Sequence, residues 1–261
     1  TQRRRELVME GSLVDLNQMS QKFCQRMKEE EQKTLYKCEK CHDRGWIIIP
    51  REHAQALFVR CECQNVNKVK GQWKESGIKV DMCKYTFSNY KVWNDFSRKA
   101  KDSASSYYVK FEVIRYSRHN SIIFCGQVGS GKTHLAVALS LNLLESGLNV
   151  VYLPYRDVVT SIKQNMLDGD YYANIINRYQ VCDVLLIDDL FKGKINESDI
   201  NIMFEIINYR YYNCLPIIVS TEFTVDKLLS VDEGVGSRIY EMCKRYVVEI
   251  PKKIENNYRL R

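Results

Sequence analysis

The stretch SIIFCGQVGSGKTHLAVALSLNLLES, residues 121–146, decides the fold. Residues 121–125 form a short apolar run of the kind expected for a buried strand, and residues 133–146 carry apolar side chains at helical spacing. Between them, GQVGSGKT at residues 126–133 fits the pattern G-x-x-x-x-G-K-[ST]. Such a loop curls its backbone N–H groups around phosphate oxygens, beside the positive end of the helix dipole. The stretch therefore predicts a nucleotide-binding P-loop in an α/β domain.

The loop supplies candidate ligands for ATP and Mg²⁺. The Lys132 side chain is expected to reach the β- and γ-phosphates, and the Thr133 hydroxyl is expected to bind Mg²⁺. A chance glycine-rich turn is the alternative, but the strand before the loop and the helix after it argue against that alternative. The candidate nucleotide-binding residues are Gly126, Gln127, Val128, Gly129, Ser130, Gly131, Lys132, Thr133 and His134.

Strand and helix patterns alternate along the rest of the chain, which is typical of a parallel sheet flanked by helices. We place this α/β domain at residues 84–261 and expect five strands in its sheet. Strands are expected at residues 121–125, 149–153, 184–187, 216–220 and 246–250, and helices at 133–146, 156–167, 171–179, 197–212 and 235–244.

A second apolar run, VLLIDD at residues 184–189, ends in two carboxylates. Ligands of parallel sheets gather at the carboxyl ends of the strands. We therefore expect Asp188 to hold Mg²⁺ and Asp189 to polarise the water that attacks the γ-phosphate. A solvated acidic strand end is the alternative, and the position of this run about fifty residues after the P-loop favours the functional interpretation.

Two weaker signals follow in the chain. Ser220, Thr221 and Glu222 end a strand pattern, so they could sense the γ-phosphate or simply form a polar loop. Arg238 could reach a phosphate in its own or a neighbouring subunit, or it could be an isolated surface arginine. The residues alone leave both pairs of alternatives open.

A smaller module precedes the α/β domain, and we place it at residues 1–83. Residues 1–35 have apolar side chains at near-helical spacing, which favours one or two amphipathic helices. Residues 36–64 contain four cysteines, a turn signal and a short apolar run ended by Pro50, which indicates a small β-rich knuckle.

The cysteines of this knuckle form two close pairs, which predicts a structural zinc site with the ligands Cys38, Cys41, Cys61 and Cys63. His42 and His53 are substitute ligands to consider, and reduced, metal-free core cysteines are the alternative to a metal site. Four thiolates would leave no open coordination position, so we expect the zinc to hold the fold and not to catalyse. A module of this size buries little apolar surface, so its folding should depend on the metal.

The composition is that of a globular protein, with 45% hydrophobic and 27% charged residues. No stretch approaches the length of a membrane span, and residues 1–30 lack the apolar core of a secretory signal. We therefore expect a cytoplasmic protein with no membrane partner. The formal net charge of +7 is a weak sign of a polyanionic partner.

With these motifs the chain resembles the bacterial DnaC/DnaI-type replicative helicase loaders, which are AAA+ ATPases. The resemblance covers nearly the whole chain and rests on the C-x-x-C…C-x-C module, GQVGSGKTHLAVAL, VLLIDDL, PIIVSTE, GSRIYEMC and NYRLR. It implies a P-loop AAA+ sheet flanked by helices, with a small N-terminal helical and zinc-knuckle module. It also implies that residues 1–83 bind a DnaB-type hexameric helicase, that residues 84–261 bind ATP, Mg²⁺ and single-stranded DNA, and that several copies assemble on the helicase during DNA replication.

Carried over residue by residue, the resemblance gives Lys132 and Thr133 the phosphate and metal roles and Asp188 the metal role. Arg238 falls at the position of an arginine finger that acts on a neighbouring subunit, which predicts weak ATP hydrolysis by the isolated chain. The candidate catalytic residues are therefore Lys132, Asp188, Asp189 and Arg238.

The sequence departs from the family pattern at two positions. Asp189 stands where AAA+ proteins usually have the longer Glu, and Glu222 stands where they usually have Asn. Ser220 or Thr221 would then be the residue that senses the γ-phosphate. The basic residues expected nearest to DNA are Arg156, Lys192 and Lys194, although charged loops are often only solvated.

Two other functions are compatible with these motifs. An IstB-type transposition helper shares the AAA+ core, but typical members lack the cysteine knuckle. A non-hydrolysing, ATP-gated adaptor would keep the nucleotide site and lack turnover. Bound zinc would discriminate the first alternative from a loader, and ATP turnover with helicase and single-stranded DNA would discriminate the second.

Overall fold

The structure is a computed structural model that describes Cys41 and residues 46–51, 54–60 and 84–261. Cys41 is buried. The helices expected in residues 1–35, and the other three candidate zinc ligands, lie outside the described residues. The division of the chain at residue 83 stays a prediction.

The β-rich character expected for residues 36–64 is present as a hairpin of β1 (Trp46–Arg51) and β2 (Ala54–Arg60). The two strands pair antiparallel, with Trp46 opposite Arg60. Pro50 lies within β1 instead of ending it, and the register shifts there, between Ile49 and Arg51. Proline has no N–H for the strand ladder, which accounts for an irregularity at this position.

A five-stranded sheet forms the centre of the larger domain, in the order β4-β5-β6-β3-β7, and all its neighbouring strands are parallel. The prediction of a five-stranded parallel sheet is confirmed. The strands are β3 (Ile122–Gly126), β4 (Val150–Pro154), β5 (Val184–Asp188), β6 (Ile217–Ser220) and β7 (Val247–Ile250).

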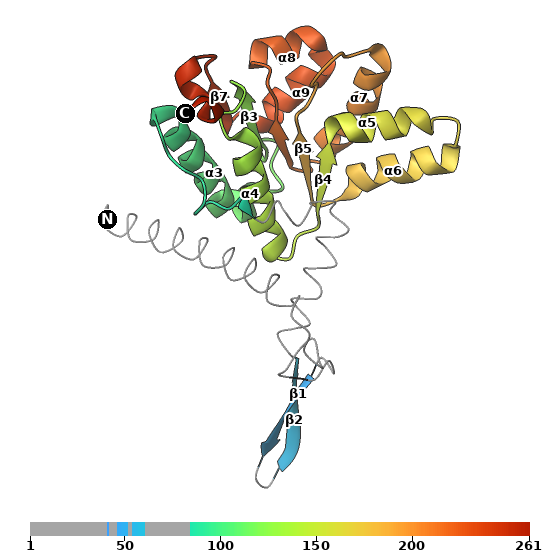
Figure 1. Ribbon diagram of the computed structural model, residues 1–261. Helices are drawn as coiled ribbons and strands as arrows, with labels where there is room; N and C mark the ends of the chain where they lie inside the picture. The colour runs from blue at the N-terminus through green and yellow to red at the C-terminus, as the bar shows by residue number, and fades with distance from the viewer. Residues whose placement is uncertain (1–40, 42–45, 52–53, 61–83) are drawn as a thin grey trace.

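Helices cover both faces of the sheet (Figure 1). Successive residues of a strand point to opposite faces, so Ile122 and Phe124 of β3 join one core while Ile123 and Cys125 join the other. The first core is closed by α3 (Asp95–Ile114) and α4 (Lys132–Glu145). The second is closed by α5 (Tyr155–Gln164), α6 (Gly169–Val181), α7 (Glu197–Tyr212), α8 (Val225–Val231) and α9 (Glu233–Cys243).

The C-terminal segment, residues 251–261, returns to the P-loop. It contains two short 3-10 helices, η2 (Ile254–Asn256) and η3 (Tyr258–Leu260). The Tyr258 N–H donates to the carbonyl oxygen of Gly129 at 2.9 Å, and the Gln127 N–H donates to Ile250 O at 2.9 Å. The P-loop is therefore bonded to the segment that follows β7. Among the described residues, no helix combines the length and apolar character that crossing a bilayer requires.

Candidate nucleotide-binding site

The P-loop connects β3 to α4 and depends on glycine at three positions. Gly126, Gly129 and Gly131 have φ values of 99°, 70° and 82°, in the region that favours glycine. A Cβ at Gly126 would lie 2.1 Å from the backbone oxygen of Ile250, and a Cβ at Gly129 would lie 2.1 Å from Oδ1 of Asn257. Both backbone conformation and close packing therefore require these glycines.

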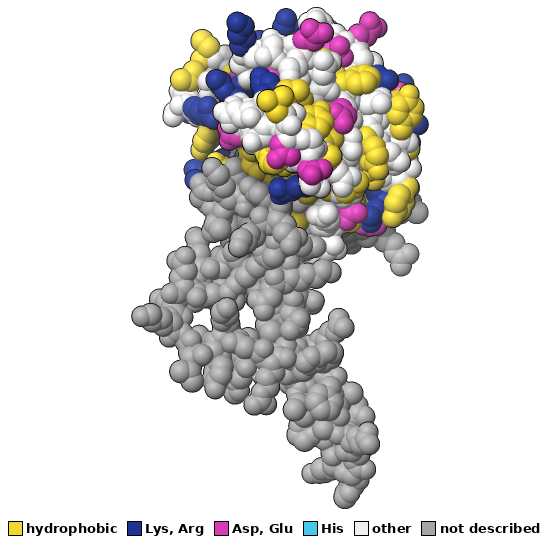
Figure 2. All heavy atoms as spheres, turned by 90° about the vertical axis from the view of Figure 1, so that its right-hand side faces the viewer, with side chains coloured by type: hydrophobic (Ala, Val, Ile, Leu, Met, Phe, Trp, Pro, Cys, Tyr) yellow, Lys and Arg dark blue, Asp and Glu magenta, His cyan; other side chains and the backbone are white. Residues whose placement is uncertain are grey.

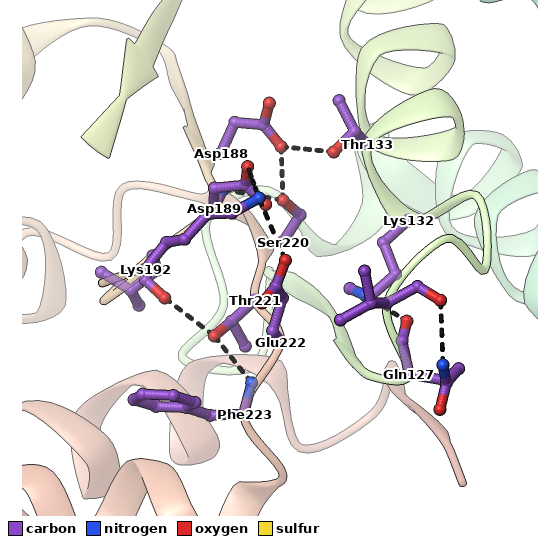
Figure 3. Close-up of polar contacts among 12 residues, drawn as sticks. Gln127, Lys132, Thr133, Asp188, Asp189, Lys192, Ser220, Thr221, Glu222 and Phe223 are labelled. Atoms are coloured by element: carbon purple, nitrogen blue, oxygen red, sulfur yellow. Dashed lines mark hydrogen bonds and ion pairs between the residues drawn. The ribbon is translucent and has the colours of Figure 1, made fainter. Parts of the chain in front are cut away.

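Lys132 is the first residue of α4, and its side chain turns into the loop. It is only 5% exposed. Its Nζ donates to the carbonyl oxygens of Gly126 at 3.1 Å and Gln127 at 2.6 Å (Figure 3). Burial lowers the pKa of Lys132 to about 8, against the opposing influence of nearby carboxylates. The loop thus holds an amine at the place where nucleotide phosphates bind in P-loop proteins.

Asp188 accepts hydrogen bonds from three elements. Thr133 Oγ1 donates to Oδ1 at 2.9 Å, and Ser220 Oγ donates to the same oxygen. Tyr152, on β4, donates to Oδ2 at 3.0 Å. Burial raises the pKa of Asp188, while the three hydrogen bonds oppose that shift. The Thr133 hydroxyl and the Asp188 carboxylate lie together as oxygen donors, the ligand type that Mg²⁺ prefers.

Asp189 has a left-handed backbone conformation, with φ 55°. Its N–H donates to Ser220 Oγ at 3.0 Å. Its carboxylate is bound by Lys192, whose Nζ lies 2.8 Å from Asp189 Oδ2 and 3.0 Å from Glu222 Oε1. The sequence interpretation placed Lys192 near DNA, whereas in the structure it lines a cavity beside the P-loop.

The structure separates the two sensor candidates. Ser220 contacts both Asp188 and Asp189. Thr221 instead turns to the loop backbone, because its hydroxyl donates to Leu190 O at 2.9 Å and accepts from the Phe223 N–H. Ser220 is therefore the sensor candidate that contacts the acidic pair, Asp188 and Asp189.

The P-loop, the acidic pair and a set of aromatic residues line one cavity of about 460 Å³. The aromatic part contains Tyr85, Tyr90, Trp93 and Tyr258. Flat aromatic walls with a few polar groups suit a planar base. These residues come from the segment before α3 and from the C-terminal segment, so the sequence interpretation missed them.

His134 supports this aromatic part. Its ring centroid lies 5.1 Å from that of Tyr85 and 5.3 Å from that of Tyr90, and its Nε2 lies 2.8 Å from Thr86 O. Burial lowers the pKa of His134. The neutral imidazole of His134 therefore predominates at neutral pH, which suits a residue that packs against the aromatic lining of the cavity.

Arg259 lines the cavity, whereas Arg238 does not. Arg238 donates from Nη1 to Gly234 O at 2.8 Å, within its own helix. Its guanidinium lies 5.0 Å from the Phe204 ring centroid and 5.5 Å from that of Tyr211. Within one chain, Arg238 is a packing residue of α7 and α9.

The described part of the chain contains no cluster of three or more His, Cys, Asp or Glu side chains that could hold a metal ion. Of the four candidate zinc ligands, only Cys41 belongs to that part, so the zinc site stays a prediction. On the face shown in Figure 2, the described Lys and Arg side chains are interspersed with Asp and Glu. That face does not form a continuous basic surface for nucleic acid.

The sheet order, the P-loop and the acidic pair define a P-loop ATP-binding domain with the AAA+ fold. Residues 79–233 match the family described as IstB-like ATP binding protein, and the chain belongs to this family. It is 35% identical over 240 residues to phage-like element PBSX protein XkdC of Bacillus subtilis (strain 168), covering 88% of this chain and 89% of that protein. It is also 24% identical to the replicative helicase loader DnaC of Escherichia coli (strain K12), over 68% of this chain and 70% of that one.

Solved structures show the same fold. The crystal structure of the DnaC helicase loader has a TM-score of 0.56 and 24% identity, covering 65% of this chain and 98% of that chain. A crystal structure of DnaI has a TM-score of 0.56 and 17% identity, covering 68% and 95%. The replication initiator DnaA bound to AMPPCP and single-stranded DNA has a TM-score of 0.55 and 26% identity, covering 66% and 51%. The resemblance to DnaC/DnaI-type proteins is confirmed.

Proposed function

We propose that this protein is an ATP-dependent loader that delivers a DnaB-type hexameric helicase to single-stranded DNA during replication. The observation that carries the ATP-dependent part is the 2.9 Å hydrogen bond between Thr133 Oγ1 and Asp188 Oδ1, beside Lys132. It brings the two candidate Mg²⁺ ligands together in a cavity with a phosphate loop. Relationship to the helicase loader DnaC supports the choice of partner.

The residues present fit ATP and Mg²⁺. The P-loop N–H groups and Lys132 would hold the phosphates, while Thr133 and Asp188 would hold Mg²⁺, which neutralises charge on the phosphates. The Asp189 carboxylate would accept a hydrogen bond from the attacking water and orient it. Ser220 would hold the Asp188 carboxylate through its hydroxyl and would hold the backbone of Asp189 by accepting from its N–H.

Arg238 would complete the site of a second copy. It lies outside its own cavity, so a phosphate contact would have to be made in trans. Such an arrangement makes hydrolysis depend on assembly, and we propose that several copies assemble on the helicase. The isolated chain would then be a slow ATPase.

The N-terminal module, residues 1–83, would bind the helicase. A zinc ion on Cys38, Cys41, Cys61 and Cys63 would fix its fold. This division of labour separates partner binding from the nucleotide site, which lies within residues 84–261.

A loading assay tests the proposal. The full chain is mixed with a DnaB-type helicase and circular single-stranded DNA, and the DNA-bound helicase is counted after gel filtration. Loading should need ATP and should fail with Lys132→Ala while the complex with helicase persists. Equal loading with and without the protein would refute the loader function.

A second candidate is an IstB-type transposition helper, favoured by the match to the IstB-like family. Such a helper would act with a transposase on double-stranded DNA. Binding to double-stranded DNA without helicase binding or zinc would favour it. An ATP-gated adaptor would load helicase with a non-hydrolysable ATP analogue as well as with ATP, so the same assay addresses that alternative.

A further inference from the structure

Lys192 binds two carboxylates, Asp189 and Glu222, in the lining of the nucleotide cavity. Lys192 Nζ lies 2.8 Å from Asp189 and 3.0 Å from Glu222, and the three side chains are 43%, 37% and 28% exposed. We call this set of three residues the Lys192 clamp. Both hydrogen bonds raise the pKa of Lys192, so its amine stays charged.

The backbone holds the clamp in place. Asp189 and Phe191 have φ values of 55° and 58°, unusual for residues other than glycine, and Gly193 has φ 98°. Phe191 is fully buried, with its ring centroid 5.6 Å from that of Tyr155. The Lys192 N–H also donates to Asp189 O at 3.0 Å. Burying Phe191 thus fixes a tight turn from which Lys192 points back to the cavity, and strained turns of this kind concentrate at functional sites.

The Lys192 clamp offsets the repulsion between two neighbouring carboxylates. Asp189 and Glu222 both lie within ion-pair distance of one ammonium, so their carboxylates are close enough to repel each other without it. The same ammonium occupies Oδ2 of Asp189, an oxygen that would otherwise be available to water. Lys192 therefore stabilises the neighbouring carboxylates of Asp189 and Glu222 and competes with water for Asp189.

We infer that Lys192 is a positioning residue that restrains Asp189 and keeps ATP hydrolysis slow in the isolated chain, an assignment that rests on the proposed ATP hydrolysis. Productive turnover then requires the ammonium to leave Asp189. Because the contacts are half-exposed, the restraint is weak and reversible.

The test compares steady-state ATP hydrolysis by the full chain with that of Lys192→Met, which keeps most of the length of the side chain and removes its charge. The kcat of Lys192→Met should rise about three- to tenfold, the size expected for releasing weak, half-exposed ion pairs. The KM for ATP should change by less than about twofold, because Lys192 holds the acid and not the nucleotide. Lys192→Arg should keep the slow rate, and Lys227→Met, at an exposed lysine on α8, should match the wild type.

Salt gives a second readout that a purely structural role would not move. At saturating ATP and Mg²⁺, raising ionic strength from about 0.05 M to about 0.5 M should speed the wild type by weakening the exposed ion pairs. Lys192→Met and Lys192→Gln should lack this response.

An unchanged or lower kcat in both Lys192→Met and Lys192→Gln would overturn the inference, as would the same salt response in variants and wild type. Failure of the proposed loader function can be distinguished from failure of the clamp. If the wild type binds ATP without hydrolysing it while Lys192→Met hydrolyses it, the clamp is supported even where loading fails. If no form binds ATP, both the nucleotide function and the clamp are wrong.

Discussion

The hydroxyl of Tyr152 donates to Oδ2 of Asp188 at 3.0 Å, from the neighbouring strand β4. Thr133 and Ser220 reach the other carboxylate oxygen. Donors from α4, β4 and β6 therefore fix the orientation of one buried acid. Such support keeps a metal-binding carboxylate in one orientation before any ion arrives.

Tyr152→Phe should lower the apparent affinity for Mg²⁺, so that Mg²⁺-dependent ATP binding requires a higher Mg²⁺ concentration. Removing one hydrogen bond to a charged group costs about 1.5–3 kcal/mol, so the apparent Mg²⁺ affinity should fall at least about tenfold. Calorimetric ATP titrations at several Mg²⁺ concentrations measure this shift. Tyr108→Phe, which removes an exposed hydroxyl bonded to Ser146, is the control and should leave the affinity unchanged. An unaltered Mg²⁺ affinity in Tyr152→Phe would show that the hydrogen bonds from Thr133 and Ser220 are enough to orient Asp188.

Lys132→Ala should lower ATP affinity at least about tenfold, because it removes a cation aimed at the phosphates. Calorimetry measures the affinity, and circular dichroism shows whether the fold persists. We expect the fold to persist, since this side chain bonds to carbonyl oxygens of the P-loop and is not part of the apolar core. Wild-type affinity in a folded Lys132→Ala protein would refute the phosphate role.

Gly126→Ala should lower the free energy of unfolding by about 2–4 kcal/mol, because it combines an unfavourable backbone with a clash against Ile250. Urea denaturation measures the loss. Gly169→Ala is the matched control, since a Cβ there meets nothing within 4 Å and the residue begins a helix. Its unfolding free energy should change by less than about 1 kcal/mol. Equal effects at both sites would contradict the packing described for Gly126.

The purified full chain should contain one zinc ion per molecule, held by Cys38, Cys41, Cys61 and Cys63. Removing it with a chelator should abolish helicase binding and leave ATP binding intact, because the metal would stabilise only the N-terminal module. Elemental analysis measures the metal, and Cys83→Ser should leave its content unchanged. A metal-free preparation with full helicase binding would disprove the zinc prediction.

Arg238→Ala should bind ATP normally and lose most helicase-stimulated turnover. An arginine finger contributes about three to five decades in rate in GTPases, and we expect a smaller loss at a site with Asp189. Unfolding free energy should drop by about 1 kcal/mol, since the contact with the Phe204 ring is lost.

Mixing tests whether Arg238 acts in trans. Arg238→Ala subunits should regain turnover when combined with Lys132→Ala subunits, because each supplies what the other lacks. A mixture as inactive as its components, with assembly on helicase and DNA intact, would place Arg238 outside catalysis.

The sequence predicted the sheet and the phosphate site because both are local patterns. The strand at β5 and the helix α7 fall where the residues indicated. Two helices were missed. The buried positions of α3 are mostly small or polar, Ser97, Ala100, Ala104 and Ser105 among them, and α8 has a single buried residue, Leu228. The large buried apolar side chains of α3, Tyr107, Phe111 and Ile114, are confined to its second half, so in both helices the periodic signal from large apolar residues is short.

The rest of the site depends on tertiary contacts. Tyr152 lies within an apolar strand and Tyr258 lies beyond the last strand, so no local pattern marks either as part of a nucleotide cavity. Lys192 looked like a loop cation available to DNA. Only the turn formed around the buried Phe191 directs it back to Asp189.

The bond from Tyr258 to Gly129 bears on protein engineering. Arg259 lines the cavity, so an affinity tag or fluorophore attached close to this residue would lie beside the nucleotide site. Such an attachment would disturb the nucleotide site, and tags are better placed elsewhere. The same proximity is useful for detection: Trp93, whose ring centroid is 5.0 Å from that of Tyr258, is an intrinsic fluorophore at the rim. Its emission offers a label-free readout of nucleotide arrival.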